Sequence, residues 1–347
     1  MSQTQREIFA QAETLPQTIE ILLAREAPGP MRPPNVVPIF TGCGTSFHLA
    51  LYAAALTRLL SRRPAAAVPA SEAWLLPDLT LRPVADACLV GISRSGTTTE
   101  VLRALEAARG SGTPTLALTL GERTRMAATA ENAIELPHVV EESVVMTQSF
   151  SNLLLALQWL VASLAGERDY LARLPEIASA VGPSLKELDR AARALLLRRP
   201  THFVFLGSGP LLGVALEGML KVKEMSQAPA EAYSSLEFRH GPMSTVTAGT
   251  LLVLISSPRT EQQDLRLGEQ MAGLGATVVH LGPLPRQRLP PEIQQVELPA
   301  GFQDWMYASL GVPFLQLLAL HQTAAIGLDP DAPRNLTSVV ELEGSGR

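Results

Sequence analysis

The sequence predicts an α/β fold with two tandem, doubly wound parallel-sheet domains, each a flavodoxin-like three-layer α/β/α unit. Short apolar runs with the length of buried strands alternate with helical segments along most of the 347 residues. The second half also repeats the first at a nearly constant offset: residues 40–44 match 205–209, 89–93 match 252–256, and 115–119 match 277–281. A constant offset over three elements indicates two copies of one α/β unit.

Composition places the chain among compact globular proteins. Hydrophobic residues make up 46%, charged residues 18%, and the net charge is −5 at pH 7. This charge argues against nucleic acid as a partner. Residues 1–15 lack an apolar signal core, and the longest apolar run, residues 153–165, is too short to span a bilayer. We therefore expect a cytoplasmic protein with no membrane partner.

The pattern divides the chain into five predicted parts. These are an N-terminal helical segment (1–34), a first domain (35–166), a helical linker (167–199), a second domain (200–328) and a tail (329–347). Strands are predicted at 36–40, 65–69, 87–92, 112–120, 133–136, 203–206, 252–256 and 277–281. Helices are predicted at 5–24, 47–60, 100–109, 149–164, 211–225 and 302–326.

The helix at 211–225 is apolar on most of its surface, yet it carries Glu217, Lys221 and Glu224 on one face, given about 3.6 residues per turn. Charges on an otherwise buried helix are costly unless they are paired or functional. The chain has three lysines, and the other 25 of its 28 basic residues are arginine (28 − 3). An ordinary surface ion pair is the alternative, but two lysines on this one helix favour a functional cluster.

Residues 93–98 are rich in hydroxyl groups and follow a predicted strand directly. Ser93, Ser95 and Thr98 are accompanied by Arg94 and by a glycine, and a helix begins after them. Free backbone N–H groups at a helix N-terminus bind anions, so phosphate is the expected occupant. A helix cap would explain one hydroxyl but not several.

A second loop, residues 43–46, follows the neighbouring predicted strand. It contains Cys43, Gly44, Thr45 and Ser46. Open α/β sheets bind ligands at the carboxyl ends of such neighbouring strands. The two loops together therefore form the candidate binding site.

Nucleotide cofactors are disfavoured by the same loops. Residues 42–44 and 207–209 begin like a dinucleotide fingerprint, but Phe47 and Leu212 stand where its third glycine belongs. The Walker pattern is absent as well. Cys43 and Cys88 provide neither a disulfide framework nor metal-ligand spacing. We expect no cofactor and no metal.

Several ordered motifs together resemble the sugar isomerase (SIS) family, and within it the isomerase half of glutamine:fructose-6-phosphate amidotransferase. The motifs lie at residues 6–9, 41–46, 92–96, 215–224, 230–233, 239–242 and 333–336. They cover nearly the whole chain, so the family assignment is specific. The resemblance implies two SIS domains and a phosphorylated sugar as the substrate.

The resemblance also implies roles for individual residues. Glu224 would be the base that moves a proton between C2 and C1 of an open-chain sugar phosphate, a task for which burial would tune a carboxylate. Lys221 and Glu217 would tune that base and hold substrate oxygens. His240, followed by Gly241 and Pro242 in a loop, would open the sugar ring. In the family this histidine reaches into the neighbouring subunit's site, which implies a homodimer.

The remaining implied site residues bind substrate. Those assigned to phosphate and sugar are Thr45, Ser46, Ser93, Ser95 and Thr98, and the wider candidate set adds Cys43, Gly44, Arg94 and Val144.

Three departures from the amidotransferase pattern shape the functional expectation. The glutaminase domain is expected to be missing, Ser338 replaces a tail lysine, and Arg94 replaces a glutamine. Residues 142–150 look more like free-standing aminosugar-phosphate deaminases and isomerases of the family. We therefore expect conversion of glucosamine 6-phosphate to fructose 6-phosphate and ammonia. The alternatives are another 6-phosphosugar isomerase, a deglycase for fructoselysine-type 6-phosphates, and a non-catalytic sugar-phosphate sensor.

Overall fold

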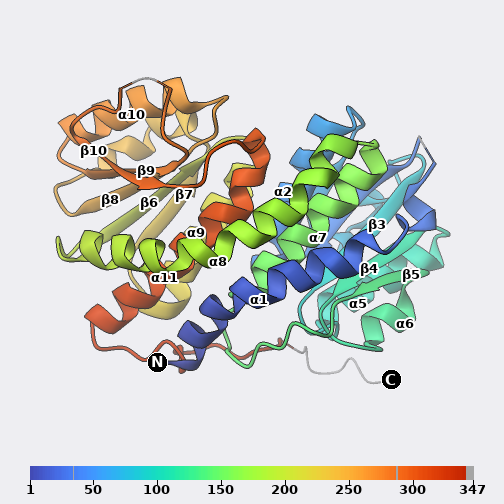
Figure 1. The fold of residues 1–347 in the computed structure, drawn as a ribbon. Coiled ribbons are helices and arrows are strands. Elements are labelled where there is room, and N and C mark those ends of the chain that lie inside the picture. Colours follow the sequence, from blue (N-terminus) through green and yellow to red (C-terminus); the bar gives the residue numbers. More distant parts are fainter. Residues whose placement is uncertain (34, 287, 341–347) are drawn as a thin grey trace. The chain divides into compact units, whose positions relative to one another are not determined.

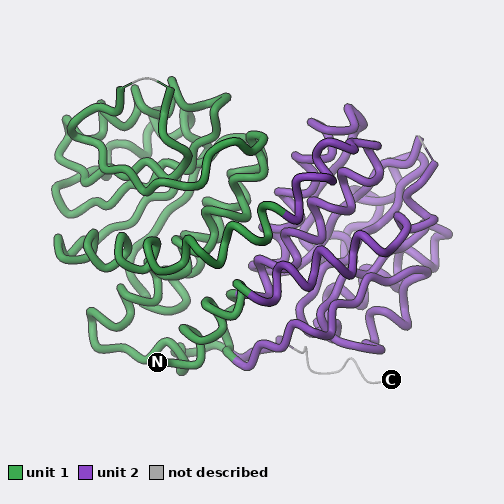
Figure 2. The backbone as a smooth tube through the Cα atoms, in the orientation of Figure 1, with its two compact units in different colours: residues 1–12, 143–147, 176–336 green, residues 13–142, 148–175, 337–347 purple. Residues whose placement is uncertain are grey.

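The computed structural model describes residues 1–33, 35–286 and 288–340. It divides into two compact units (Figure 2): unit 1 contains residues 1–12, 143–147 and 176–336, and unit 2 contains residues 13–142, 148–175 and 337–340. Helices α1 (Gln3–Leu23) and α8 (Arg168–Leu196) contribute to both units. Pro34, in the predicted N-terminal segment, and residues 341–347 of the predicted tail lie outside the described residues.

Unit 2 contains a five-stranded parallel sheet in the order β2-β1-β3-β4-β5 (Figure 1). Its strands are β1 (Val37–Gly42), β2 (Ala66–Pro69), β3 (Ala87–Ser93), β4 (Thr115–Thr119) and β5 (Asn132–Glu135). Helices α2 (Thr45–Leu60) and α7 (Gln148–Ala165) pack together on one face. The other face is covered by α3 (Ala70–Leu75), α4 (Pro77–Thr80), α5 (Thr99–Gly110) and α6 (Arg125–Thr129).

Unit 1 repeats this arrangement with the strand order β10-β9-β8-β6-β7, again fully parallel. Its strands are β6 (His202–Gly207), β7 (Ala230–Tyr233), β8 (Thr250–Ile255), β9 (Thr277–Gly282) and β10 (Ile293–Glu297). Helices α9 (Leu211–Ser226) and α11 (Tyr307–Ala325) cover one face, and α10 (Glu261–Gly273) covers the other (Figure 1). The predicted fold class, two three-layer units of flavodoxin-like order, is confirmed.

Short 3₁₀ helices complete the described chain: η1 (Gly29–Met31), η2 (Leu236–Arg239), η3 (Pro242–Thr245) and η4 (Asp304–Met306). No helix among the residues described is long and apolar enough to cross a bilayer.

The central strands of both sheets are buried on both faces. Every residue of β3 and of β8 is buried. Strands covered by helices on both sides read as continuous apolar runs, so these two strands were predicted from the sequence. Strands β7 and β10 were not predicted, because charged or amide residues interrupt their apolar residues and leave no continuous apolar run.

The two halves share a glycine turn after their first strands. Gly44 and Gly209 have left-handed φ angles of +51° and +60°. A Cβ atom on Gly42 would lie 2.7 Å from the Ser46 backbone, and one on Gly207 would lie 2.4 Å from the Leu211 carbonyl oxygen. Both turns therefore need one glycine for its conformation and another for the close approach of helix to strand.

Within unit 1, the first turn of α1 is held by a carboxylate from the far end of the chain. The Gln3 N–H donates to Asp331 Oδ2 at 2.6 Å, and the Thr4 N–H donates to Asp331 Oδ1 at 2.8 Å. Burial alone would raise the pKa of Asp331, but hydrogen bonds from Thr4 and Gln3 and the charge of Arg6 outweigh it and lower that pKa.

This cap makes a prediction about stability. Replacing Asp331 with asparagine should lower the free energy of unfolding by about 1 kcal/mol at pH 7, because the helix loses a charged N-terminal acceptor. A lowered folded-state pKa stabilises the protein above the unfolded value near ~3.9, and this contribution is lost as the pH falls through the folded-state pKa. The difference between D331N and the wild type should therefore vanish in strong acid. Urea unfolding of D331N and the wild type, at pH 7 and in strong acid, measures this difference.

Asp86, which is exposed in unit 2, provides the matched control. The D86N variant should change the unfolding free energy by less than about 0.5 kcal/mol. An equally small effect of D331N at neutral pH would show that the cap does not stabilise α1.

Candidate active site

Helix α9 of unit 1 carries a buried lysine between two carboxylates. Lys221 Nζ lies 3.1 Å from Glu217 Oε1 and 2.6 Å from Glu224 Oε2. The side chains of Lys221 and Glu217 are each 1% exposed, whereas that of Glu224 is 21% exposed. The structure thus places the three predicted residues together. Lys221 and Glu217 are buried, whereas Glu224 is partly exposed.

The charge state of Lys221 follows from its two partners. Burial favours the neutral amine, but the Glu217 and Glu224 carboxylates outweigh this effect and raise the pKa of Lys221. The ammonium is therefore the form present at neutral pH. It holds the partly exposed carboxylate of Glu224 in one position on the helix surface.

The close packing of α9 on its sheet explains why the lysine is buried. A Cβ on Gly218 would lie 2.9 Å from the Phe205 ring of β6, so the helix approaches the strand closely at this turn. The helix ends at Gln227, whose φ is +57°, and the chain then enters β7. Three buried residues, Val214, Val222 and Met225, pack the rest of the helix into unit 1.

His240 is exposed in the connection between η2 and η3, as its position before Gly241 and Pro242 predicted. The backbone N–H of His240 donates to the Glu237 carbonyl oxygen at 2.9 Å, and Gly241 follows with φ +120°. A loop therefore presents the imidazole. Its predicted position in the site of a second subunit stays a prediction.

In unit 2, the predicted phosphate loop connects β3 to α5. Ser93 Oγ and Thr98 Oγ1 lie 3.0 Å apart, and the Gly96 N–H donates to Ser93 Oγ at 3.2 Å. Thr98 precedes α5 without capping it through its side chain. The loop is thus organised by its own hydroxyl groups, and Gly96 adopts a left-handed φ of +67°.

The second predicted loop lies beside it, at the end of β1. Since β1 and β3 are neighbours and the strand order reverses there, the two loops meet at the topological switch point of the sheet. Thr45 and Ser46 form the buried start of α2, and Gly44 is exposed. This is the position at which open α/β sheets bind ligands.

Cys43, in the same loop, is a neutral thiol. Burial, and secondarily the Glu100 carboxylate, raise its pKa to about 12. It can line a site but does not act as a nucleophile at neutral pH. Glu100 lies in the first turn of α5, and its buried Oε2 has no hydrogen-bond partner among the residues that the structure describes. Sequence patterns do not single out Glu100, because an acidic residue in the first turn of a helix is common.

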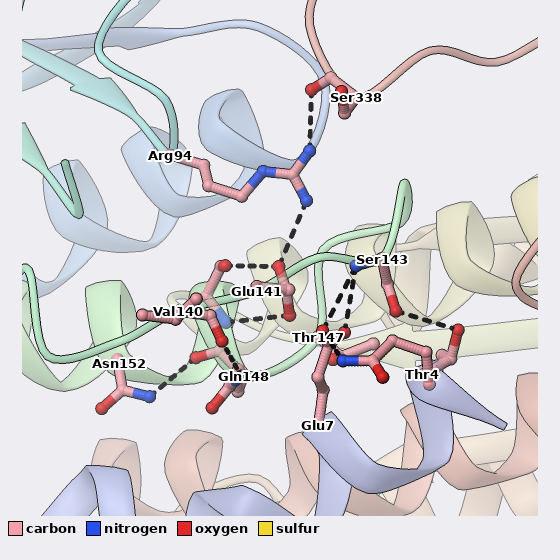
Figure 3. A network of polar contacts seen from close by, with 12 residues as sticks. Thr4, Glu7, Arg94, Val140, Glu141, Ser143, Thr147, Gln148, Asn152 and Ser338 are labelled. Atoms are coloured by element: carbon pink, nitrogen blue, oxygen red, sulfur yellow. Dashed lines mark hydrogen bonds and ion pairs between the residues drawn. The ribbon is translucent and has the colours of Figure 1, made fainter. Parts of the chain in front are cut away.

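Arg94 directs its guanidinium to two other parts of unit 2 (Figure 3). Its Nη1 lies 3.2 Å from Glu141 Oε2, and its Nη2 donates to the Ser338 carbonyl oxygen at 2.7 Å. A cavity of about 500 Å³ adjoins these groups. Its lining includes Arg94, Ser95, Glu141, Ser149, Ser338 and Val339. The sequence analysis missed Glu141, since one of two adjacent glutamates looks like ordinary surface.

Val144 belongs to a short segment of unit 1, residues 143–147. The segment begins at Ser143, whose N–H lies 3.3 Å from both carboxylate oxygens of Glu7, and Ser143 Oγ lies 3.2 Å from Thr4 Oγ1 (Figure 3). The predicted site residues are thus divided: the phosphate-loop candidates belong to unit 2, whereas Val144, the α9 cluster and His240 belong to unit 1.

The loop after β8 shows how the second copy of the repeat has changed. Ser256 Oγ and Thr260 Oγ1 both donate to Asp264 Oδ2, at 2.9 and 2.6 Å. Burial raises the pKa of Asp264, although hydrogen bonds from Thr260 and Ser256 oppose this effect. An acid of the same unit thus engages two of the loop's hydroxyls, which distinguishes this loop from the predicted phosphate loop of unit 2.

The SIS domain model matches residues 38–163 and 196–285. These ranges include both loops of unit 2, helix α9 and His240. The chain belongs to the SIS family.

Curated relatives agree with this membership. The glutamine–fructose-6-phosphate aminotransferase of Methanothermobacter thermautotrophicus is 31% identical over 315 residues, which cover 88% of this chain and 51% of that protein. The enzyme of the same name from Gloeobacter violaceus is 29% identical, over 97% of this chain and 58% of its own. The chain spans about half the length of these relatives.

Solved structures match over nearly their full length. A glucosamine-6-phosphate deaminase from Thermotoga maritima has a TM-score of 0.83 and 31% identity, covering 98% of this chain and 100% of its own. A tagatose-6-phosphate ketose/aldose isomerase from Escherichia coli has a TM-score of 0.83 and 25% identity, covering 95% of each chain. The C-terminal domain of the Francisella tularensis aminotransferase, at 24% identity and TM-score 0.87, shows the shared fold.

These matches confirm the predicted family and the prediction that the chain is an enzyme. The predicted roles of single residues are not tested by them and stay predictions. Among the residues described, no group of three or more His, Cys, Asp or Glu side chains could hold a metal ion.

The α9 cluster predicts a large energetic asymmetry between two lysines of one helix. Replacing Lys221 with methionine should lower the free energy of unfolding by about 3–5 kcal/mol, because Glu217 remains buried opposite an apolar side chain. Lys223, two residues on, is exposed, and K223M should change stability by less than about 0.5 kcal/mol. Urea unfolding of both variants measures the difference.

A second substitution separates lost charge pairing from lost packing. Adding Glu217→Gln to K221M removes the buried charge that has lost its lysine partner, so the double variant should be more stable than K221M alone. Equal stability of K221M and the wild type would contradict the account of the cluster.

Proposed function

We propose that this chain is a phosphosugar isomerase of SIS type that acts on aminosugar 6-phosphates and converts glucosamine 6-phosphate and water to fructose 6-phosphate and ammonia. The observation that carries the proposal is the Glu217–Lys221–Glu224 cluster, a carboxylate held in place by a buried ammonium. The choice of substrate is supported by the 31% identity to the Thermotoga deaminase over the whole of that chain.

The chemistry needs one carboxylate that serves as base and then as acid. Glu224 removes the proton from C2 of the open-chain aminosugar and returns it to C1. In the same conversion O1 gains a proton and the amine nitrogen loses one, so the C1 aldehyde becomes an alcohol and the amine at C2 becomes an imine. Water then adds to the imine carbon, and the C–N bond breaks with release of ammonia. At 21% side-chain exposure, Glu224 is the member of the cluster that a substrate reaches most easily.

Lys221 and His240 assist at the two ends of the reaction. The Lys221 ammonium keeps Glu224 at a fixed position and provides positive charge as an oxyanion develops at O1. His240, presented by an exposed loop, transfers the proton that opens the sugar ring. The reaction takes its nitrogen from the sugar itself, so it requires no glutamine.

The phosphate loop of unit 2 supplies binding. Ser93, Ser95 and Thr98 present hydroxyls at the N-terminus of α5, together with Thr45 and Ser46 at the start of α2. Helix N-termini and hydroxyl groups favour a dianionic phosphate. A homodimer with His240 shared between subunits and a cytoplasmic location belong to the same proposal.

Removing the carboxylate charge of Glu224 tests the proposed base. The E224Q variant should bind glucosamine 6-phosphate within about threefold of the wild type but lose about 10²–10⁴-fold in kcat, which is the usual contribution of general acid–base catalysis. Stoichiometric release of ammonia and fructose 6-phosphate measures turnover, and calorimetry measures binding.

The matched control is Glu237, an exposed glutamate of η2 in the same unit. E237Q should keep wild-type turnover. Unchanged turnover in E224Q would exclude Glu224 as the base. Wild-type protein that binds the sugar phosphate tightly without turnover would favour the sensor alternative. Turnover of a ketose 6-phosphate instead would favour another 6-phosphosugar isomerase, and turnover of a glycated amino-acid 6-phosphate would favour a deglycase.

A further inference from the structure

We propose that Arg94 is a positioning residue rather than a phosphate ligand: its guanidinium fastens the C-terminal segment at Ser338 and the loop at Glu141 to the phosphate loop. The inference rests on the proposed function only in taking residues 93–98 as the phosphate loop. The three groups, all in unit 2, are drawn together in Figure 3.

The Arg94 guanidinium is already engaged by two acceptors of the protein. The contacts to Glu141 Oε2 at 3.2 Å and to the Ser338 carbonyl oxygen at 2.7 Å use different terminal nitrogens. The side chain of Arg94 is 13% exposed and that of Glu141 is 1% exposed. A fork of fixed donors suits two acceptors in different directions, and a buried arginine is held by such partners.

The Glu141 carboxylate, which accepts from Arg94, is itself held in place. Glu141 Oε1 accepts the Ser149 N–H at 3.3 Å, and its other oxygen accepts the Ser149 hydroxyl. Ser149 lies in the first turn of α7, where a carboxylate is favoured by the helix dipole. Beside it, Gln148 Nε2 donates to the Val140 carbonyl oxygen at 2.6 Å. These contacts with the start of α7 therefore fix the position of the Glu141 carboxylate, so it is a rigid acceptor for Arg94.

The backbone of Arg94 connects the guanidinium to the phosphate loop. The carbonyl oxygen of Arg94 accepts the Thr119 hydroxyl and the Leu120 N–H, both at 3.2 Å, so the backbone of this residue is anchored at the end of β4. The next residue, Ser95, lines the same 500 Å³ cavity as Ser338 and Val339. The side chain thus places the C-terminal segment as a wall of the cavity next to the phosphate-binding hydroxyls.

The consequence is a separation of roles within one loop. Neighbouring hydroxyls and N–H groups bind the phosphate, and Arg94 sets the position of the loop and of the segment near Ser338. Lysine cannot replace it, because one ammonium cannot span the Glu141 carboxylate and the Ser338 carbonyl with a fork geometry.

The test compares Arg94→Gln and Arg94→Lys in the full-length protein. Both should weaken inorganic phosphate binding about tenfold and raise KM for the sugar phosphate by a similar factor, with kcat within about threefold. Both should also increase the rate of tryptic cleavage after the exposed Arg334 about tenfold. Mass spectrometry of the released C-terminal peptide measures this rate. Arg82→Gln, at an exposed i,i+4 pair of unit 2, should change neither quantity.

Each result decides between the two roles. If R94K keeps wild-type phosphate affinity, or if cleavage after Arg334 is unchanged in R94Q, Arg94 is not a positioning residue. If R94Q fails to fold because the buried Glu141 carboxylate loses its contact with the guanidinium, the R94Q/E141Q double variant removes that charge and gives the same two readouts. Phosphate binding and proteolysis need no turnover, so an inactive wild-type protein would overturn the proposed function and still leave this inference tested.

Discussion

A fully buried lysine is the constraint on which unit 1 depends. An ammonium removed from water is tolerated only with acceptors at hydrogen-bond distance, and Lys221 finds them four residues before and three residues after itself. Both acceptors lie on the same helix, so these two ion pairs form within α9. The sheet and α11 pack against the helix and exclude water from the cluster. The close approach of Gly218 to Phe205 does so on the side of β6.

The internal repeat shows how one scaffold carries two different loops. Both copies keep the glycine turn, because strand and helix approach too closely at Gly42 and at Gly207 for a side chain. The loops after the third strand differ. In unit 2 the hydroxyls bond to one another and to backbone N–H groups, whereas in unit 1 Asp264 accepts from two of them. A buried carboxyl group at that position disfavours an anion, which supports the proposal that phosphate binds at the loop of unit 2.

Most of the fold could be predicted from the sequence, because strands β3 and β8 are buried on both faces and read as apolar runs. Strands β7 and β10 escaped prediction, since charged or amide residues interrupt their apolar residues and they give no such run. The α9 cluster was predictable from helical spacing alone. Glu141 and Asp331 were not, because each has a partner distant in sequence: Glu141 contacts Arg94, and Asp331 contacts the first turn of α1. Long-range polar contacts of single acidic residues leave no local pattern.

The central claim is that the carboxylate held by Lys221 moves a proton between C2 and C1. The most direct measurement uses glucosamine 6-phosphate with deuterium at C2 and follows the label into product by NMR. The account predicts a primary isotope effect on ammonia release, deuterium at C1 of part of the fructose 6-phosphate with the rest exchanged into water, and loss of both in the E224Q variant. Ammonia release with no isotope effect, or with an aldose 6-phosphate as the product that keeps the deuterium at C2, would contradict it.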